Sequence, residues 1–338
     1  MKKQLFTIFL LPVTLFSQEY LSNQTIERVR VIISQTVLQH YDEALTICDS
    51  LENEFPQKPV GYFFHAATLQ SRMLDYENYD EIDDFFKNTQ FAVELSKNDL
   101  KNYPNSSWPN FFLGGAIGYE AMVRGKSNEL FRAFRDGWKS IRALQNALEI
   151  DSTNYDIYLG IGTYKYYRSQ LSKYLKWLPF VDDEREMGKS MIRTAIDRGK
   201  LTRPAAINGL FWILVKEENY PEAEQLINTA ITEYPGSRFF LWGKAKLEFK
   251  QGNWLEARNS YMAILETYRK ENVSTPFNKM QCYTYLAEIY FNLGNLPEAI
   301  HYANNALEIE IDSYLQKRAK PIQQQAEDIL QKAQKQSS

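Results

Sequence analysis

The stretch at 283–309, YTYLAEIYFNLGNLPEAIHYANNALEI, decides how this chain folds. Ala287 and Ala299 stand twelve positions apart, and Ala306 follows seven residues after the second of them. Each small residue lies in a segment whose apolar side chains recur at helical spacing, and Gly294 separates the two segments. Helices that cross closely need small side chains at the crossing, because a large one would push them apart. The stretch therefore predicts a helical hairpin.

Matching positions recur along the whole chain, so the hairpin is one unit of a repeat. The small position of the second helix recurs at spacings of 48, 48, 48, 35, 34 and 42 residues, at Ala44, Ala92, Ser140, Gly188, Ala223, Ala257 and Ala299. The small position of the first helix is filled by Ala66, Gly114, Gly162, Ala245 and Ala287, whereas Ile32 and Phe211 depart from it. A proline, which stops a helix, follows the second position by twelve residues at Pro56, Pro104 and Pro235.

This pattern resembles the tetratricopeptide repeat family over roughly residues 25–313. The resemblance implies an all-α, right-handed superhelical solenoid of about seven helical hairpins. Their expected bounds are about 25–58, 59–105, 107–153, 154–200, 204–237, 238–271 and 280–311, within a solenoid that spans 18–311. Residues 312–338 are expected to form a C-terminal capping helix with a frayed tail, in which Pro321 is a first-turn residue.

Three central hairpins are expected to be unusually tall. The interval between the two small positions is 26 residues from Ala66 to Ala92, and it is the same in the next two repeats. The interval from Ala245 to Ala257 is 12 residues. Fourteen extra residues, shared between two helices, make each hairpin about 10 Å taller at about 1.5 Å per residue. Tall neighbours of equal length can pack along their full height or form the edge of a deep groove.

The N-terminus and the cysteines favour an exported protein. Residues 1–17 combine two lysines with a short apolar run, and this predicts a signal peptide cleaved after Ser17, although an internal buried segment gives a similar pattern. Without that segment, 37 basic residues face 42 acidic ones, which argues against a nucleic-acid partner. Cys48 and Cys282 belong to the first and last repeats, so we expect two free, buried thiols. Export without disulfides favours a bacterial periplasm or cell surface, and the mature chain shows no transmembrane segment.

Three groups of residues could have a chemical role. The acidic run 182–186 could cap a helix that starts there, contact a partner or hold a metal; we expect Asp182 or Asp183 to be the N-cap. The aromatic side chains at 155–180 could fill the core or contact a ligand. Tyr166 and Tyr167 are adjacent on a helix, so at least one of them should be exposed or lie at a second interface. The acidic window of repeat two and the basic window of repeat three could be solvated, pair with each other or, on the basic side, bind an anion.

The chain carries no motif typical of an enzyme or a metal site. The three histidines, at positions 40, 65 and 301, have no metal-ligand spacing, and no phosphate loop or nucleophile elbow is present. We therefore expect no catalytic residues, no metal and no cofactor.

The family resemblance implies a scaffold that binds a protein or peptide partner on its concave surface, here aided by the tall hairpins. The residues expected to contact the partner are Tyr62, His65, Asn110, Tyr158, Tyr167, Trp177, Asn208, Trp212 and Trp242. A glycan-binding module of a bacterial cell envelope is the alternative, because exposed Tyr and Trp rings can stack on sugars.

Overall fold

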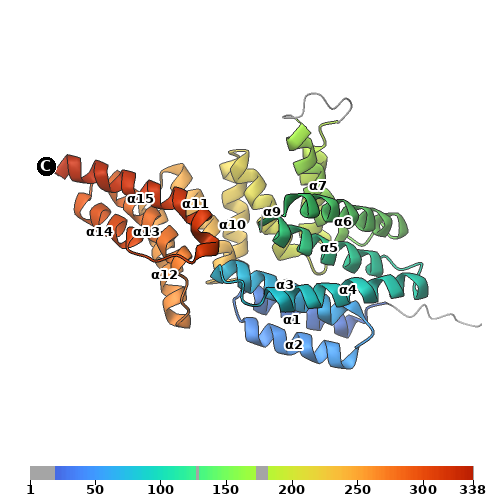
Figure 1. Ribbon diagram of the computed structural model, residues 1–338. Helices are drawn as coiled ribbons and strands as arrows, with labels where there is room; N and C mark the ends of the chain where they lie inside the picture. The colour runs from blue at the N-terminus through green and yellow to red at the C-terminus, as the bar shows by residue number, and fades with distance from the viewer. Residues whose placement is uncertain (1–19, 127–128, 173–181, 338) are drawn as a thin grey trace, which may run out of the picture.

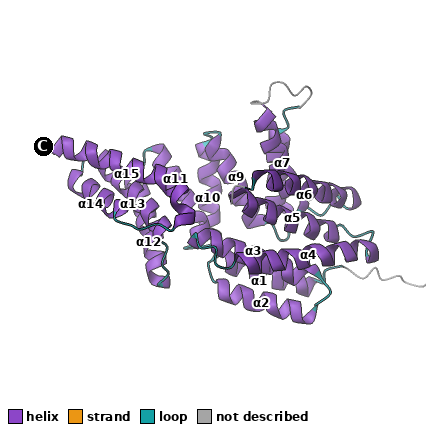
Figure 2. Ribbon diagram, in the orientation of Figure 1, coloured by secondary structure: helices purple, strands orange, loops and turns teal. Residues whose placement is uncertain are grey.

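The computed structural model describes residues 20–126, 129–172 and 182–337. These residues form fifteen α-helices and one short 3-10 helix, with no β-strand among them (Figures 1 and 2). Within the same ranges, no helix has both the length and the apolar character that a membrane span requires.

Fourteen of these helices pair in chain order as seven hairpins, and the last helix covers the final one (Figure 1). The hairpins are α1 (Asn23–Val37) with α2 (Tyr41–Glu54), α3 (Pro59–Tyr76) with α4 (Ile82–Asn102), α5 (Trp108–Lys126) with α6 (Leu130–Ile150), α7 (Ile157–Ser172) with α8 (Arg185–Arg198), α9 (Arg203–Lys216) with α10 (Tyr220–Glu233), α11 (Arg238–Gln251) with α12 (Trp254–Glu271), and α13 (Pro276–Asn292) with α14 (Leu296–Leu307). The predicted all-α repeat solenoid is confirmed.

Two hairpins stand taller than the standard ones. Helices α3 to α6 have 18, 21, 19 and 21 residues, whereas α9, α10 and α11 have 14 each. A seven-residue excess lengthens a helix by about 10 Å. The third hairpin predicted to be tall is α7–α8, whose described helices have 16 and 14 residues. The segment between them, at 173–181, lies outside the described residues.

The small residues lie where the two helices of a hairpin cross. A Cβ atom on Gly162 would lie 2.6 Å from the backbone oxygen of Gly188, and one on Gly188 would lie equally close to the oxygen of Gly162. In the preceding hairpin the Ser140 hydroxyl donates to the backbone oxygen of Gly114 at 2.7 Å. The alanines at this position of the second helices are fully buried, namely Ala44, Ala92, Ala223, Ala257 and Ala299. Close crossing therefore explains the residue pattern seen in the sequence.

The acidic run at the start of α8 stabilises the turn into that helix, but not in the predicted way. The N-cap is Glu184, not Asp182 or Asp183, and its carboxylate binds Lys165 of α7. The Asp183 carboxylate accepts the backbone N–H of Arg185 at 3.2 Å. The run begins three residues before the helix, and its carboxylates bond to the turn and to α7.

The end of α3 packs against the sixth hairpin, in the second half of the array. Arg238, the first residue of α11, is only 1% exposed, and its guanidinium binds the Asp75 carboxylate at 2.7 to 3.2 Å. The same guanidinium binds Glu271 at the end of α12 and lies 4.4 Å from the ring centre of Tyr268. The Tyr268 hydroxyl donates to the backbone oxygen of Asp75 at 2.9 Å. We call Asp75, Arg238, Tyr268 and Glu271 the closure cluster.

Further bonds join the first two hairpins to the later ones. The Ser237 hydroxyl donates to the backbone oxygen of Val37 at 2.5 Å. The carboxylate of Glu77 accepts two bonds from Arg318 of the last helix, and its backbone adopts φ 51° at the end of α3. The end of α1 and the end of α3 thus contact the second half of the solenoid (Figure 1). The acidic window of repeat two contributes Asp75 and Glu77 to this closure, so these two carboxylates do not pair with the basic window of repeat three.

The last helix, α15 (Gln316–Ser337), packs on α13 and α14 as a cap. Its alanines at 319, 326 and 333 are buried against the last hairpin. Pro321 lies inside this helix rather than in its first turn, and the helix continues to Ser337 where a frayed tail was expected. Cys48 and Cys282 are both buried and free, as predicted.

Candidate functional site

The residues predicted to bind a partner do not form one continuous surface. Asn110 lines a long groove on α5, whereas Tyr62 and His65 line a separate, smaller hollow. Trp177 lies outside the described residues. The other predicted residues lie on α7, α9 and α11, away from both hollows.

The larger hollow is a groove between the two tall hairpins, with a volume of about 860 Å³. Helices α4 and α6 form its walls and α5 forms its floor. Its lining is Gln90, Val93, Glu94, Lys97 and Leu100 from α4, Asn110, Leu113, Ile117, Glu120 and Arg124 from α5, and Arg135, Asp136, Lys139, Arg142, Ala143 and Asn146 from α6. The lining positions of α6 extend over twelve residues, with about 16 Å of helix between the first and the last. The groove is therefore long enough for an extended peptide or a short helix.

Charges in the groove are arranged around one buried carboxylate. Asp136 is buried, and Arg135 and Lys139 donate to it at 3.0 and 3.2 Å. Burial acts to raise the pKa of Asp136, but these two bonds outweigh it and hold the pKa below its ordinary value. Arg124 lies between the carboxylates of Glu120 and Glu129, 3.6 and 3.5 Å away. Five Lys or Arg and three Asp or Glu line the groove, so its lining has a net charge of +2 (5 − 3).

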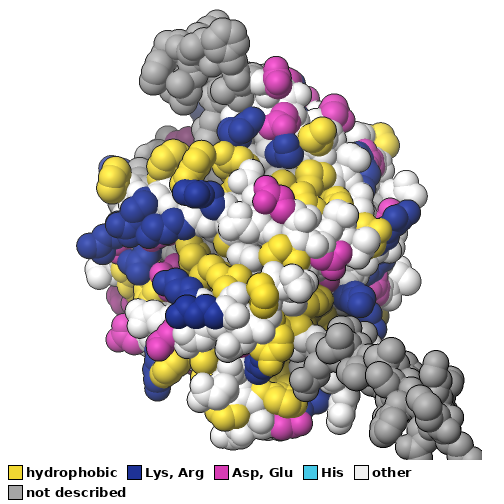
Figure 3. Space-filling model, turned by 90° about the vertical axis from the view of Figure 1, so that its right-hand side faces the viewer, with side chains coloured by type: hydrophobic (Ala, Val, Ile, Leu, Met, Phe, Trp, Pro, Cys, Tyr) yellow, Lys and Arg dark blue, Asp and Glu magenta, His cyan; other side chains and the backbone are white. Residues whose placement is uncertain are grey.

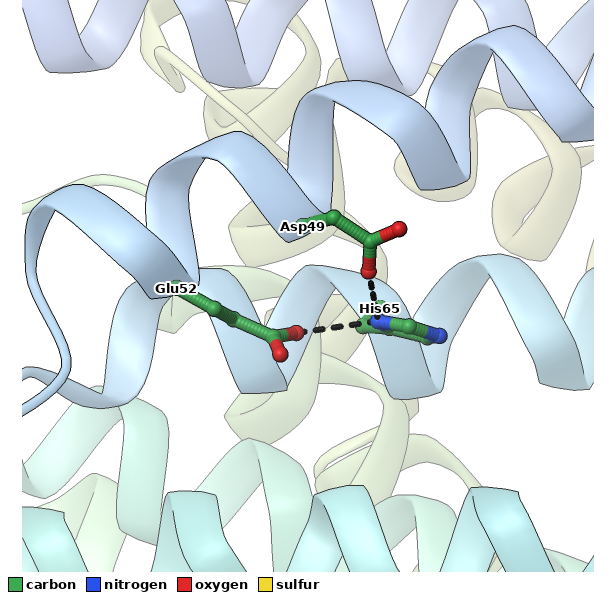
Figure 4. Close-up of side chains that lie close together, drawn as sticks. All are labelled: Asp49, Glu52 and His65. Atoms are coloured by element: carbon green, nitrogen blue, oxygen red, sulfur yellow. Dashed lines mark hydrogen bonds and ion pairs between the residues drawn. The ribbon is translucent and has the colours of Figure 1, made fainter.

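The smaller hollow, of about 400 Å³, contains the one described group of three residues with metal-ligating atoms close together. Nδ1 of His65 lies 2.9 Å from Glu52 and 3.5 Å from Asp49, and the three possible ligand atoms lie within 4.8 Å of one another (Figure 4). Arg72 and Lys87 line the same hollow as four carboxylates, and Arg72 binds one of them, Glu81. The arrangement is better explained as a hydrogen bond between His65 and Glu52 that joins α3 to α2.

The aromatic residues of α7 and α9 divide between core and surface. Tyr166 is fully buried, whereas Tyr167 is 39% exposed, which confirms the expected difference between these neighbours. Tyr158 is half-buried and donates to the backbone oxygen of Ser152 at 2.9 Å. Trp212 of α9 is 38% exposed, and Asn208 on the same helix is half-buried. Among the described rings of hairpin four, Tyr166 belongs to the core and Tyr158 and Tyr164 pack against it, whereas Tyr167 is exposed.

Trp242 lies beside the closure cluster. Its indole Nε1 donates to the Tyr268 hydroxyl at 3.4 Å, and its ring packs against Tyr261 at 6.1 Å. The predicted partner contact is therefore engaged within the array itself.

The most exposed aromatic side chains of the described chain stand on α6. Phe131 is 81% exposed, Phe134 is 77% exposed and Trp138 is 55% exposed. They follow the spacing i, i+3, i+7, which places them along one face of the helix. We call these three residues the aromatic edge. Figure 3 shows hydrophobic side chains beside Lys and Arg on the face formed by the tall hairpins.

The sequence interpretation missed the aromatic edge because it considered only the charges of the basic window. The signal was present in the sequence. Ser140 must face the crossing with α5, and Trp138, two positions earlier, is rotated by about 200° from it around the helix. Phe131, nine positions earlier, is rotated by about 180°.

Comparisons with known proteins concern the fold. No model of a known protein family matches the chain, and no curated protein matches it in sequence. The structure of the APC/C hetero-tetramer Cut9–Hcn1 aligns with 87% of this chain and 52% of its own chain, at 14% identity and a TM-score of 0.52. The C-terminal part of a TPR repeat-containing protein from Cytophaga hutchinsonii aligns over 88% of this chain and 98% of its own, at 15% identity and a TM-score of 0.43. PilW, a type IV pilus biogenesis factor, aligns over 75% and 97%, at 14% identity and a TM-score of 0.47. With its seven consecutive hairpins and their close crossings, this chain has the tetratricopeptide-repeat fold.

Proposed function

We propose that this chain is a non-catalytic scaffold that holds a segment of a partner protein in the groove between α4 and α6. The repeat fold supports an interaction scaffold in general, and the groove is the observation that carries the more specific proposal. Its volume of about 860 Å³ lies in the range of sites that enclose ligands.

The lining of the groove indicates the chemistry of the partner. Leu113 and Ile117 provide an apolar floor, and Lys97, Lys139 and Arg142 stand on the walls. An apolar floor with cationic walls suits a peptide segment that alternates apolar and acidic side chains. Among the residues that the family resemblance implied, Asn110 is the one that lines this groove. The proposed contact surface is therefore the groove of the tall hairpins rather than a groove along all the first helices.

The proposal includes export to a bacterial periplasm or cell surface, which rests on the basic and apolar character of residues 1–17. Expression of the full chain in a bacterial host, followed by N-terminal sequencing of the mature protein, tests it. Cleavage after Ser17 is expected, and an intact N-terminus in the cytoplasmic fraction would contradict export.

A photo-crosslinking experiment tests the groove. A photoreactive amino acid is placed at Gln90 or Asn146, which are exposed on opposite walls, and at exposed Asn259 of α12 as the control. Crosslinking in cells of the source organism is expected to join the two groove positions, but not the control, to the same protein. Peptide mapping should place the crosslink in a segment rich in Asp or Glu. Equal crosslinking at Asn259, or different products from the two walls, would refute binding in the groove.

Charge reversal provides a second test. Replacing Lys97 and Arg142 by Glu turns two of the five groove cations into anions, which changes the net charge of the lining from +2 to −2. We expect the crosslinked product to be lost while the helical circular dichroism spectrum is retained. Retention of the product would exclude an acidic segment as the occupant.

A further inference from the structure

The aromatic edge is an exposed apolar surface with no partner inside the described chain. None of its three rings, at Phe131, Phe134 and Trp138, lines either hollow, and none contacts another aromatic ring among the described residues. Their high exposure keeps these rings in contact with water, which is unfavourable unless something covers them.

Cations accompany the rings on the same helix. Between Phe131 and Arg142, α6 carries four Lys or Arg residues and one carboxylate, a net charge of +3 (4 − 1). The four are Arg132, Arg135, Lys139 and Arg142, and all are exposed. The one carboxylate, Asp136, is buried and bonded to Arg135 and Lys139. Between Phe131 and Arg142, α6 thus presents aromatic rings flanked by cations. Arg132 also binds Glu129 just before the edge, at 3.0 Å, and the other three cations stand on the side of the groove.

The shape of the aromatic edge favours a membrane surface over a protein as its partner. Aromatic anchors at protein interfaces are typically enclosed by a well-packed surround that excludes water. Here the rings project from a convex helix, and the groove that could receive a protein segment lies on another side of α6. Helices that lie on a membrane surface present Trp and Phe on one side and Lys and Arg beside them. The long side chains of Lys and Arg can reach the headgroups while the rings enter the boundary of the acyl chains.

We propose that the aromatic edge and its flanking cations seat this protein on an anionic phospholipid surface, with α6 parallel to the membrane plane. The contact extends over the twelve residues from Phe131 to Arg142, with about 16 Å of helix between the first and the last. The rings provide apolar contact, and the cations provide attraction to anionic headgroups that added salt weakens. The three rings lie outside the partner groove, whereas Arg135, Lys139 and Arg142 line it as well, so substitution of the rings tests the membrane contact separately from the groove.

The test uses the mature chain and phosphatidylcholine vesicles with or without phosphatidylglycerol. Co-sedimentation is expected with the anionic vesicles only and is expected to weaken as salt is added. The triple substitution Phe131→Ser, Phe134→Ser and Trp138→Ser should weaken binding by about tenfold or more, because the apolar contact is removed. Its matched control is Leu255→Ser with Met262→Ser on α12, two exposed apolar residues away from the edge, which should bind like the unmodified protein.

Trp138 supplies a direct readout of contact. The chain has six Trp residues, and lipids brominated near the headgroup should quench part of their fluorescence. Trp138→Phe should keep most of the binding but lose that quenching. Thermal melting of each variant establishes that it is folded, which is expected because the three side chains contribute little to the core.

Three outcomes would overturn the proposal. One is the absence of binding to anionic vesicles at low salt, which would leave a protein as the partner of the edge. Another is equal binding of the triple variant and the control variant. The third is quenching that persists unchanged in Trp138→Phe.

Discussion

Replacing Arg238 by Met removes the cation at the centre of the closure cluster while keeping a long apolar side chain. Arg238 is 1% exposed, and it binds Asp75 and Glu271. Desolvation of the guanidinium acts to lower its pKa, but the bonds to these two carboxylates outweigh it and raise the pKa, so the cation is retained. Without the cation, the negative charges of the Asp75 and Glu271 carboxylates are no longer balanced by the guanidinium that binds them both.

The cost follows from the burial of the two carboxylates. The Asp75 side chain is 10% exposed and cannot regain full hydration while α3 stays docked. The Glu271 side chain is 33% exposed and can turn towards water. Removing one partner of a buried ion pair costs about 3–5 kcal/mol, and with one carboxylate able to rehydrate we expect about 3 kcal/mol. This loss should appear as undocking of α3 from α11 and α12, because repeat arrays lose contacts locally rather than as a whole.

Hydrogen–deuterium exchange measures this local opening. A loss of 3 kcal/mol makes opening more frequent by about a hundredfold, at 1.4 kcal/mol for each factor of ten. Amides in α3 and α11 should exchange faster by about this factor, while amides in α7 and α8 should keep their rates. Small-angle scattering should show a larger radius of gyration if the undocked ends separate.

The control is Arg193→Met, which removes an Arg–Glu ion pair at the surface. Arg193 contacts Glu222 at 2.6 Å, with both side chains more than a third exposed. Pairs of this kind contribute about 0–1 kcal/mol. If Arg238→Met accelerated exchange no more than Arg193→Met, the closure cluster would not hold the two ends of the solenoid together. If exchange rose equally in all helices, the cluster would support global stability rather than a local closure.

The remaining predictions concern packing, alkaline pH and the thiols. Gly188→Ala places a methyl group 2.6 Å from a backbone oxygen and should destabilise the fold by about 1–3 kcal/mol in urea unfolding. Gly137→Ala, whose methyl group meets nothing within 4 Å, should stabilise it by about 0.5–1 kcal/mol. The opposite order would show that the close helix crossing is not the reason for glycine at position 188. Burial raises the pKa of Tyr119 to about 12, above the value of about 10 in an unfolded chain, so its neutral form contributes stability that is present below pH 10 and lost as pH rises from 10 towards 12. Tyr119→Phe should make the alkaline loss of stability less steep over that window in a pH series of urea melts, and an unchanged slope would contradict this. Burial also raises the pKa of the Cys48 and Cys282 thiols, so both should react with a thiol reagent only after unfolding, and mass spectrometry that finds either one modified in the native protein would refute its burial.

The repeat and its crossings could be predicted because they depend on local constraints. A hairpin brings together positions 12 or 26 residues apart, and the crossing admits only small side chains. Once Gly162 is assigned to the crossing, Tyr166, four positions later, falls on nearly the same side of α7. Tyr167 is rotated a further 100° away. The burial of Tyr166 and the exposure of Tyr167 follow from this geometry.

The closure cluster could not be predicted from the sequence in the same way. Asp75 and Arg238 are 163 positions apart, and they meet because of the twist that accumulates over the three hairpins between theirs. A small change in the angle between successive hairpins would separate them. Several cations in the sequence could pair with Asp75. No feature of the residues near Asp75 or Arg238 in the sequence favours Arg238 as the partner over the cations of the basic window of repeat three. Long-range ion pairs of a solenoid thus depend on its pitch, which the sequence pattern does not specify.

Helix α6 can take part in both proposed contacts, the peptide groove and the lipid surface. It is long enough to present residues that are not needed for its crossing with α5. Ser140 faces α5, Lys139 lines the groove, and Trp138 points away from the crossing. Successive residues are rotated by 100°, so these three neighbours occupy three different sides of one helix. A peptide in the groove would contact the side of Lys139, whereas a lipid surface would contact the side of Trp138. Because the two sides differ, a peptide in the groove would leave the rings of the aromatic edge accessible, and the two proposed contacts would compete only for the cations they share, Arg135, Lys139 and Arg142.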